Sequence, residues 1–468
     1  MDDAGSLTGS LPVTTAGTLA GWIAGLDYRS LPADIVHQAK ICMLDSIACQ
    51  IGGMQLKPSQ VLLDVLGEVA GGKPVSIPGS PARIGLLGAA YLGAQAANAL
   101  DFDDSFRTGA PCHPGATVVP PGLAVAEARD SGGAALLAAV VAGYEVSLRI
   151  GRAVQASPAR KADVWGFSPW QAFGAVTTTA SLIGLPATTI LSALGLTGAQ
   201  APVPSIRKFV DGARPFSWIK NAYGIASEVG VLSALLAERG FLGNREIFDG
   251  PNGFWIMSGS DRWQPELATE ELGGRWMIRD VGFKPYACCR WTHTMVDALK
   301  SLAPSLAGRP IERIDVHGFR ELTCSLAGDP PDSIIEAQFN ARWVAALEAS
   351  GRSPAKGLHD RDIGDPTVVA LAHNVHLHHE PERDEPYFKL GTLPVRVVVT
   401  AGGETFAAEA EKPTGSPEAG GFSDADMVAK FIQVVSPVIG EAKTKQALDI
   451  VMTLEDRPAR ALTAALVP

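Results

Sequence analysis

Apolar residues recur at helical spacing through about the first 250 residues of the chain. Residues 35–52 and 86–100 show this period most clearly, with apolar side chains three and four positions apart. Glycine and alanine are frequent inside these stretches. Such small residues let neighbouring helix backbones approach closely, although each helical glycine costs about 1 kcal/mol of helix propensity. We therefore predict an all-helical first half with tight packing between its helices.

Short runs rich in β-branched and aromatic residues follow and alternate with helical stretches. They predict strands at residues 276–283, 311–319, 375–379, 395–400 and 405–410. From residue 422 the helical period returns, with Ser423 as the expected N-cap and with Phe431 and Val435 on the apolar face.

Together these patterns predict a mainly α fold, in which a large all-helical domain is joined to a smaller α+β lid domain. The expected boundaries are residues 1–275 for the helical domain, 276–412 for the lid, and 413–468 for a segment that returns to the helical domain. The Pro- and Gly-rich residues 413–421 are predicted to be the linker. A length of 468 residues also favours two domains, because one hydrophobic core seldom serves more than about 250–300 residues.

Composition and charge narrow the partners that the protein can have. Hydrophobic residues make up 46% of the chain and charged residues 19%, which is typical of a globular protein. The formal net charge of −10 disfavours nonspecific binding to nucleic acid or to an anionic membrane, because phosphate contact needs clustered lysine and arginine. We expect neither partner, and we expect an anionic substrate to be held by cations gathered locally.

Three features bear on where the protein resides. The first residues, Met-Asp-Asp-Ala-Gly-Ser, lack the basic and apolar regions of a secretory signal. The most apolar run, residues 134–144, is shorter than the roughly 20 residues of a membrane helix, so a buried helix is predicted there. The six cysteines show no CxxC spacing and are typical of reduced thiols. A cytoplasmic protein is the expectation.

A dense polar cluster closes the apolar helix predicted at residues 86–100. It consists of Asp101, Asp103, Asp104 and Ser105, and His113 follows after a short loop. Acidic residues at the C-terminal end of a helix oppose its dipole, at a cost of about 0.3–1 kcal/mol each. A functional site would compensate for that cost, and a solvated cap and turn is the alternative.

Cationic and aromatic residues gather before a later predicted helix, at Lys284, Tyr286, Arg290 and His293. Helix N-termini favour anions through their free N–H groups, and neighbouring cations strengthen that preference. This cluster therefore predicts a carboxylate site, with an ordinary strand-to-helix junction as the alternative.

Other chemistries find less support in the sequence. Cys288 and Cys289 lie near His293, but adjacent cysteines are more often buried apolar groups than nucleophiles. His376 and His378 point to one face of a predicted strand and His379 to the other, so no metal site is expected there. The sequence contains no GxGxxG, P-loop or GxSxG motif.

Several segments, taken in their order along the chain, resemble the MmgE/PrpD family. They are Leu-Asp-Ser-Ile-Ala at 44–48, Ala-Leu-Asp-Phe-Asp-Asp-Ser at 99–105, His-Pro-Gly at 113–115, Ala-Gly-Tyr-Glu-Val at 142–146, Gly-Phe at 166–167, Phe-Gly-Ala-Val at 173–176, Ser-Trp-Ile-Lys-Asn-Ala at 217–222, Leu-Leu-Ala at 235–237, Lys-Pro-Tyr through His at 284–293 and Ala-Gln-Phe at 337–339. The resemblance spans nearly the whole chain. It implies a homodimer with a helical domain and a lid, no metal or organic cofactor, and a small di- or tricarboxylate substrate.

The resemblance also implies roles for residues of this chain. The implied catalytic residues are His113, Asp101, Lys220 and Lys284. His113 is the leading proton-transfer residue, because a near-neutral pKa suits general acid–base work, and the lysines would stabilise developing negative charge. The residues expected to bind substrate are Ser105, Asp104, Tyr144, Ser168, Tyr286, Arg290 and His293.

The sequence departs from the family pattern in two places. Ser168 stands where many relatives carry a histidine directly after the Gly-Phe segment. The loop from Ser105 to His113 is longer than in dehydratase or decarboxylase members of the family, and it contains Arg107. Tyr144, Tyr286 or Lys284 could supply the proton-transfer group that the serine lacks. Both departures concern the substrate more than the fold.

The resembled family includes 2-methylcitrate dehydratase, cis-aconitate decarboxylase and iminodisuccinate epimerase, which all handle a proton next to a carboxylate. The leading hypothesis is a lyase that dehydrates a 2-methylcitrate-like hydroxy acid. Epimerisation of a dicarboxylate such as iminodisuccinate is the first alternative, and decarboxylation of a cis-aconitate-like acid is another. A catalytically silent anion-binding homologue is the hypothesis from a different class.

Overall fold

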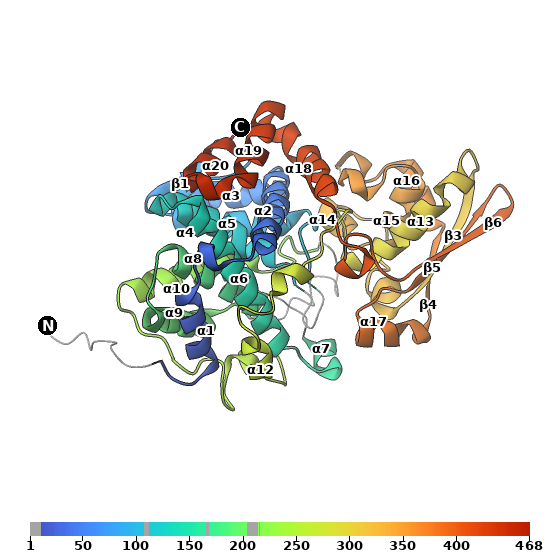
Figure 1. Ribbon diagram of the computed structural model, residues 1–468. Coiled ribbons are helices and arrows are strands. Elements are labelled where there is room, and N and C mark those ends of the chain that lie inside the picture. Colours follow the sequence, from blue (N-terminus) through green and yellow to red (C-terminus); the bar gives the residue numbers. More distant parts are fainter. Residues whose placement is uncertain (1–10, 107–111, 165–167, 204–213, 215, 359) are drawn as a thin grey trace, which may run out of the picture.

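A large helical body and a smaller body built on a four-stranded sheet make up the protein, shown as a computed structural model in Figure 1. The structure describes residues 11–106, 112–164, 168–203, 214, 216–358 and 360–468. Arg107 and the Gly-Phe segment at 166–167 lie outside the described residues. The predicted class, mainly α with a smaller α+β part, is confirmed.

The helical body is formed by the first part of the chain. Its helices are α1 (Thr15–Gly25), α2 (Ala33–Gly53), α3 (Lys57–Val69), α4 (Leu86–Ala99), α5 (Pro114–Arg129), α6 (Gly133–Ala153), α7 (Pro158–Asp163), α8 (Ser168–Leu182), α9 (Ala187–Gln200), α10 (Tyr223–Glu238), α11 (Phe254–Met257) and α12 (Pro265–Thr269). A short antiparallel hairpin of β1 (Pro74–Ser76) and β2 (Arg83–Gly85) interrupts them. The expectation of an all-helical domain missed this hairpin, because three-residue strands are too short to show a period.

Helices α6, α8 and α10 pack closely in the centre of this body. A Cβ atom added at Gly143 of α6 would lie 2.1 Å from Thr178 Oγ1 of α8. One added at Gly230 of α10 would lie 2.6 Å from the Cβ of Ala175 and 2.7 Å from the main-chain oxygen of Ala172. The small residues are therefore required by the approach of the helices.

Helix α6 is longer than the apolar run that predicted it. Its 21 residues are long and apolar enough to cross a membrane by length and composition, but 89% of the apolar window is buried inside the protein. Glu145 and Arg149 end the apolar run at the sequence level, and in the structure they form a buried ion pair at 3.2 Å. Arg149 also donates to the main-chain oxygens of Glu270 and Arg275, at 2.6 and 2.7 Å.

The end of the chain packs against its beginning. Helices α18 (Asp424–Ile439) and α19 (Glu441–Met452) pack against α2 (Figure 1), α20 (Ala459–Ala465) packs against α5, and all three share one apolar core with α2. Phe431 and Val435 are fully buried in that core together with Ile47 of α2. Ser423 and Asp426 form a capping box at the start of α18, as the N-cap prediction requires.

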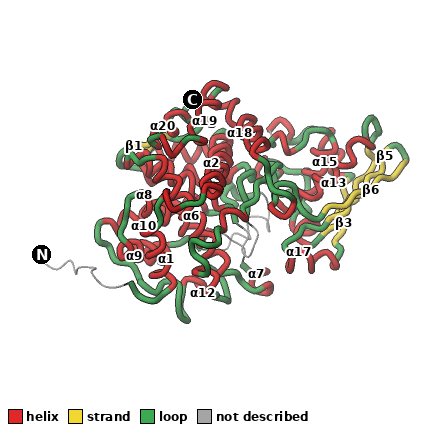
Figure 2. Tube along the Cα trace, viewed as in Figure 1, coloured by secondary structure: helices red, strands yellow, loops and turns green. Residues whose placement is uncertain are grey.

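The smaller body contains the sheet, which lies at one end of the molecule in Figure 2. Its strands β3 (Ile311–Gly318), β4 (Val375–His379), β5 (Val395–Ala401) and β6 (Glu404–Ala410) lie in the order β4-β3-β5-β6. Strand β3 pairs in parallel with β4, placing Val316 opposite Leu377, and antiparallel with β5, placing Val316 opposite Val397. The helices of this body are α13 (His293–Leu306), α14 (Ile334–Ala337), α15 (Ala341–Ala349), α16 (Pro366–His373) and α17 (Asp384–Leu390).

Four of the five predicted strands are confirmed, and the strand predicted at residues 276–283 is wrong. Met277–Asp280 forms a single 3₁₀ turn. Its neighbouring N–H groups bond to the helical body instead of to a sheet: Ile278 donates to Glu145 Oε1 at 3.0 Å, and Gly282 donates to the Ser105 carbonyl at 2.8 Å. Tertiary contacts override the β-propensity of this segment.

The chain passes between the two bodies twice, near residue 283 and near residue 415. The two crossovers are bonded to each other, because Phe283 donates its N–H to the Gly415 carbonyl at 2.9 Å. Gly415 has a φ of 82°, and a Cβ there would lie 2.2 Å from the Phe283 oxygen, so this contact needs glycine. Both crossovers therefore meet beside the polar cluster that follows α4.

Candidate active site

The turn after α4 carries the acidic cluster into the interior. Asp101 adopts a left-handed φ of 50°, which directs the chain back after the helix end, and such a conformation costs a non-glycine residue about 1–3 kcal/mol. Asp101, Asp103 and Asp104 are all buried, at 3%, 0% and 0% exposure. The alternative of a solvated cap is thereby wrong.

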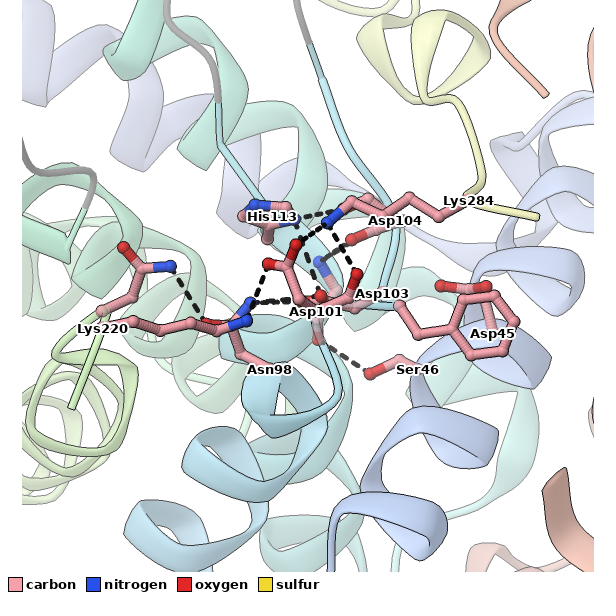
Figure 3. Close-up of polar contacts among 12 residues, drawn as sticks. Asp45, Ser46, Asn98, Asp101, Asp103, Asp104, His113, Lys220 and Lys284 are labelled. Carbon is pink, nitrogen blue, oxygen red and sulfur yellow. Dashed lines mark hydrogen bonds and ion pairs between the residues drawn. The ribbon is translucent and has the colours of Figure 1, made fainter. Parts of the chain in front are cut away.

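Asp101 lies between two lysine ammonium groups, as Figure 3 shows. Its Oδ1 is 2.7 Å from Lys220 Nζ and its Oδ2 is 3.0 Å from Lys284 Nζ. Lys284 also donates to the main-chain oxygen of Asp101 at 2.9 Å. The three residues come from the turn after α4, the segment before α10 and the first crossover, so the fold joins three distant parts of the sequence here.

The pKa values of Asp101, Lys220 and Lys284 depend on the charges that these residues place next to one another. Burial alone would raise the pKa of Asp101, but the two lysine charges outweigh it and hold that pKa well below its usual range. Burial lowers the pKa of Lys220, and the Asp101 charge only partly offsets this. For Lys284 the charges of Asp101 and Asp103 outweigh burial and raise the pKa. Lys284 is therefore the more firmly protonated of the two lysines.

His113 precedes α5 and lies beside this ion-paired group. Its Nδ1 is 2.7 Å from the main-chain oxygen of Asp104, and because a carbonyl only accepts, Nδ1 carries the proton of the neutral ring. The Nε2 lone pair is then the exchangeable position. Burial lowers the pKa of His113, and the charge of Asp103, whose Oδ1 is 3.6 Å from Nδ1, opposes this only in part. The ring is neutral near pH 7 in the free protein.

Asp103 and Asp104 form hydrogen bonds next to His113 that support its position. Asp103 accepts from Asn98 Nδ2 at 3.1 and 2.9 Å. Asp104 accepts from the Gly115 N–H at 3.1 Å and from the Tyr144 hydroxyl at 2.7 Å. Burial, reinforced by the charges of Asp45 and Asp103, raises the pKa of Asp104 well above its ordinary value. The hydroxyl of the fully buried Tyr144 is thus engaged by Asp104 and serves the structure around the imidazole.

The side chains of Tyr286, Arg290 and His293, predicted to bind substrate, form contacts within the protein. The Tyr286 hydroxyl donates to Asp297 Oδ1 at 2.6 Å. Arg290 donates to the carbonyls of Phe283 and Thr414, both at 3.3 Å, and so links the two crossovers. His293 is fully buried, with Nε2 3.1 Å from the Cys288 carbonyl and Nδ1 3.3 Å from Arg290, so both of its ring nitrogens are engaged within the protein.

Ser168 and Ser105, two predicted binding residues, lie close to the ends of described segments. Ser168 is the first residue of α8, and its side chain lies outside the described part of the chain. Ser105 exchanges main-chain hydrogen bonds with Gly282, both at 2.8 Å. The Ser105 hydroxyl is buried and has no hydrogen-bond partner among the residues that the structure describes.

Sequence reasoning gave no role to several residues that contact this group. Gln338, at the end of α14, donates to the Ala99 carbonyl at 2.8 Å and lies 3.4 Å from Lys220 Nζ through its Oε1. Gln171 of α8 accepts from the His113 N–H at 2.9 Å. The resemblance of the Ala-Gln-Phe segment at 337–339 to the family could have indicated a role for Gln338. A charged residue on the apolar face of α18 could likewise have indicated a role for Lys430.

No group of three or more histidine, cysteine, aspartate or glutamate side chains is arranged to hold a metal ion within the described ranges. The acidic residues of the site are instead paired with lysines, an asparagine and main-chain N–H groups. The chemistry that this arrangement can perform is proton transfer by His113 beside two cations.

Comparison with known proteins covers nearly the whole chain. Residues 17–266 match the MmgE/PrpD N-terminal domain, and residues 286–456 match the MmgE/PrpD C-terminal domain. The cis-aconitate decarboxylase-like protein oryM of Aspergillus oryzae is 25% identical, over 93% of this chain and 94% of its own. The cis-aconitate decarboxylases of Aspergillus terreus and Homo sapiens are each 24% identical, over 93% of this chain and 92% and 90% of theirs.

Proposed function

Because this chain belongs to the MmgE/PrpD family, we propose that it is a lyase that acts on a small tricarboxylic acid by proton transfer next to a carboxylate. The observation that carries the proposal is the position of His113 beside Asp101 and the two lysines that pair with it. The relatives named above, which are cis-aconitate decarboxylases or a protein like them, support the lyase class.

Proton transfer next to a carboxylate sets two requirements. Charge that develops on the substrate must be stabilised by cations placed in advance, and a positioned acid or base must move the proton. Lys284, whose pKa is raised, supplies a cation that stays charged at neutral pH. His113 Nε2 supplies the proton-exchanging atom.

We take decarboxylation of a cis-aconitate-like acid as the first candidate reaction, because relatives over more than nine-tenths of the chain carry that name. The bond between the departing carboxylate and the carbon skeleton breaks, carbon dioxide leaves, and the electron pair that remains is taken up by a proton from His113. The imidazole must then be protonated in the complex. The negative charges of a bound tricarboxylate would raise its pKa and so favour that form.

Dehydration of a 2-methylcitrate-like hydroxy acid is the second candidate. The neutral imidazole with its proton fixed on Nδ1 favours it, because such a ring can remove a proton at Nε2 without any prior change of charge. A second group must then protonate the departing hydroxyl. Lys220, whose pKa is lowered by burial, is the candidate donor.

One experiment separates these reactions. The protein is incubated in deuterium oxide with cis-aconitate, 2-methylcitrate and iminodisuccinate, and the products are followed by proton NMR, with His113→Gln as the control. Release of carbon dioxide with one solvent deuteron in the product supports decarboxylation, and new alkene signals from the hydroxy acid support dehydration. Exchange without a new product indicates an epimerase. Silence with all three acids contradicts the proposed function and favours an anion-binding protein.

A further inference from the structure

Lys430 is a buried lysine of α18 that the chemistry described so far does not use. Its side chain is 3% exposed, and its neighbours on the buried face of the helix are the apolar Met427 and Phe431. A buried ammonium group is strongly destabilising unless it is paired and its donors are satisfied. The contacts of Lys430 therefore indicate what the fold gains from keeping a charge there.

The ammonium group of Lys430 has three acceptors, and each belongs to a different segment. Nζ donates to Asp45 Oδ1 of α2 at 2.6 Å, to the Phe102 carbonyl at 2.6 Å and to the Lys284 carbonyl at 3.0 Å. It also lies 3.9 Å from the centre of the Phe102 ring. One side chain of the C-terminal segment thus joins α2, the turn after α4 and the first crossover.

Two of these acceptors belong to the backbone that carries the ion-paired site. Phe102 directly follows Asp101, and the third acceptor is the carbonyl of Lys284 itself. The Lys284 side chain returns to Asp101, at 3.0 Å from Oδ2 and 2.9 Å from the main-chain oxygen. The Lys430 bonds therefore hold the two backbones at the separation at which this pair forms.

Asp45 keeps the Lys430 ammonium group in place. Its carboxylate is fully buried, and the 2.6 Å ion pair joins α2 to α18 across 385 residues of sequence. The Lys430 charge opposes the rise in the pKa of Asp45 that burial causes. The pair thus ties the ammonium of α18 to α2.

We propose that Lys430 is a positioning residue for the proposed reaction, acting through the main chain of Phe102 and Lys284, and that Asp45 holds it there. The catalytic part of this inference rests on the proposed function. The geometric part, that Lys430 sets the place of Lys284 relative to His113, can be tested without turnover. Sites of this kind lose rate steeply when reacting groups move by about 1 Å.

Lys40 offers a matched control. It also joins α2 to the C-terminal segment, with Nζ donating to the Met452 carbonyl and to Glu455 Oε1, both at 2.8 Å. Its side chain is 8% exposed, and none of these partners belongs to the site. Replacing either lysine removes one buried cation, so a loss of stability is common to both variants.

We expect Lys430→Met to lower kcat by roughly tenfold to hundredfold, because the Asp101–Lys284 pair loses its support. Lys40→Met should keep the wild-type kcat. Chemical denaturation of both variants establishes that each is folded under the assay conditions. Asp45→Asn, which keeps the Oδ1 acceptor without the charge, should give a smaller fall than Lys430→Met.

The measurement that does not need turnover is an NMR titration of the His113 ring, identified among the nine histidines by its absence in His113→Gln. The Lys284 charge is one of the influences that lower the His113 pKa. If Lys284 moves away, that pKa rises in Lys430→Met, and it stays at the wild-type value in Lys40→Met.

A folded Lys430→Met variant that keeps either the wild-type kcat or the wild-type His113 titration overturns the inference. If the wild-type protein converts none of the acids, the proposed function fails, and the titration alone decides whether Lys430 positions the site. If Lys430→Met does not fold, Lys430→Gln, which keeps two donor protons, takes its place with the same expectations.

Discussion

A single hydrogen bond decides which nitrogen of His113 can exchange a proton with a substrate. The Asp104 carbonyl holds the proton on Nδ1, so Nε2 is left to face the chemistry. The ring contributes no charge to the free site near pH 7, whereas Lys284 does. Substitution of the imidazole should therefore change proton transfer more than it changes binding.

His113→Gln should lower kcat by about 10²–10⁴-fold, the usual contribution of a general acid or base. The dissociation constant of a bound tricarboxylate should change little, because both lysines remain. Steady-state kinetics and calorimetric titration of the same variant measure the two effects. Near wild-type turnover would place the proton-transfer group elsewhere, with Lys220, whose pKa is lowered, as the next candidate.

Lys284→Ala should weaken both turnover and binding. Its ammonium is expected to attract the ground-state carboxylate and also the charge that develops on it, so its loss affects both states. We expect a fall of about 2–4 kcal/mol in transition-state stabilisation, by analogy with other preorganised donors. The test is kcat/KM together with a titrated dissociation constant. An unchanged dissociation constant would contradict a ground-state role for this lysine.

The pH dependence of kcat/KM should reveal whether His113 acts as an acid or as a base in the free protein. Its pKa is lowered below the ordinary 6.5, so its protonated fraction falls as pH rises above that lowered value. Decarboxylation, which needs the protonated ring, should show kcat/KM decreasing through neutral pH. Dehydration, which needs the neutral ring, should show a level profile there and a decrease only on the acid side. In either case the decrease in kcat/KM that His113 causes should be absent in His113→Gln.

The candidate residues of the site could be identified from the sequence, but their ion-pair and hydrogen-bond partners could not. Asp101 and Lys284 are 183 residues apart, and nothing in their spacing indicates that they meet. His293 shows the limit most clearly. A histidine at the start of a helix is a natural anion ligand, yet both of its nitrogens bond within the protein, and only the tertiary structure determines this. The catalytic and binding roles themselves stay predictions.

At the scale of elements, helix-to-helix distance is set by glycine. Gly230 of α10 faces main-chain atoms of α8, which cannot move aside as the end of a flexible side chain can. By contrast, Gly25 at the end of α1 has open space around its Cβ position. The same substitution should thus have opposite effects at the two positions.

Gly230→Ala should destabilise the protein by about 1–3 kcal/mol, because the added methyl group forces α8 and α10 apart. Gly25→Ala should be neutral or stabilising by up to about 1 kcal/mol, because alanine favours the helix and meets nothing. Urea denaturation of the two variants compares them directly. Equal stability of both would show that the α8–α10 contact is not as close as described.

Elements were predicted best where local pattern and tertiary packing agree. Strands β3 and β5 alternate between buried and more exposed positions, and the sequence predicted all four strands of the sheet within one or two residues. Residues 277–280 have the composition of a strand but lack a sheet edge to pair with. The hairpin of β1 and β2 was missed for the opposite reason, because its pairing is real but too short to be periodic.

At the scale of the whole molecule, the class and the family could be predicted because they depend on patterns spread over the entire chain. The confirmed family model matches cover 17–266 and 286–456, which leaves the first crossover between them. What the sequence did not indicate is how deeply the last segment enters the first core. That depends on which apolar faces meet, and a helical period by itself names no partner.

A chain that ends at residue 421 should not fold cooperatively. It would lose nine large apolar side chains from the core around α2: Met427, Phe431, Val435, Ile439, Ile450, Val451, Leu454, Leu462 and Leu466. At about 2 kcal/mol each, their loss exceeds the 5–15 kcal/mol by which proteins are usually stable. Circular dichroism and solubility test this expectation, and co-expression of residues 422–468 as a separate chain should restore folding. A soluble truncated chain with a sharp unfolding transition would contradict it.

The return of α18–α20 to α2 also has a consequence for biosynthesis. Helix α2 leaves the ribosome early and is partly covered by α4, α5 and α6, but the residues that cover its remaining apolar face begin only at Met427. At about 5–20 residues per second, the interval between residue 53 and residue 427 lasts roughly 20 to 75 seconds. Throughout that interval the nascent polypeptide exposes this apolar face of α2, which could engage other nascent chains. We expect this intermediate to require chaperones during translation, and the requirement then follows from the order of synthesis rather than from the finished fold.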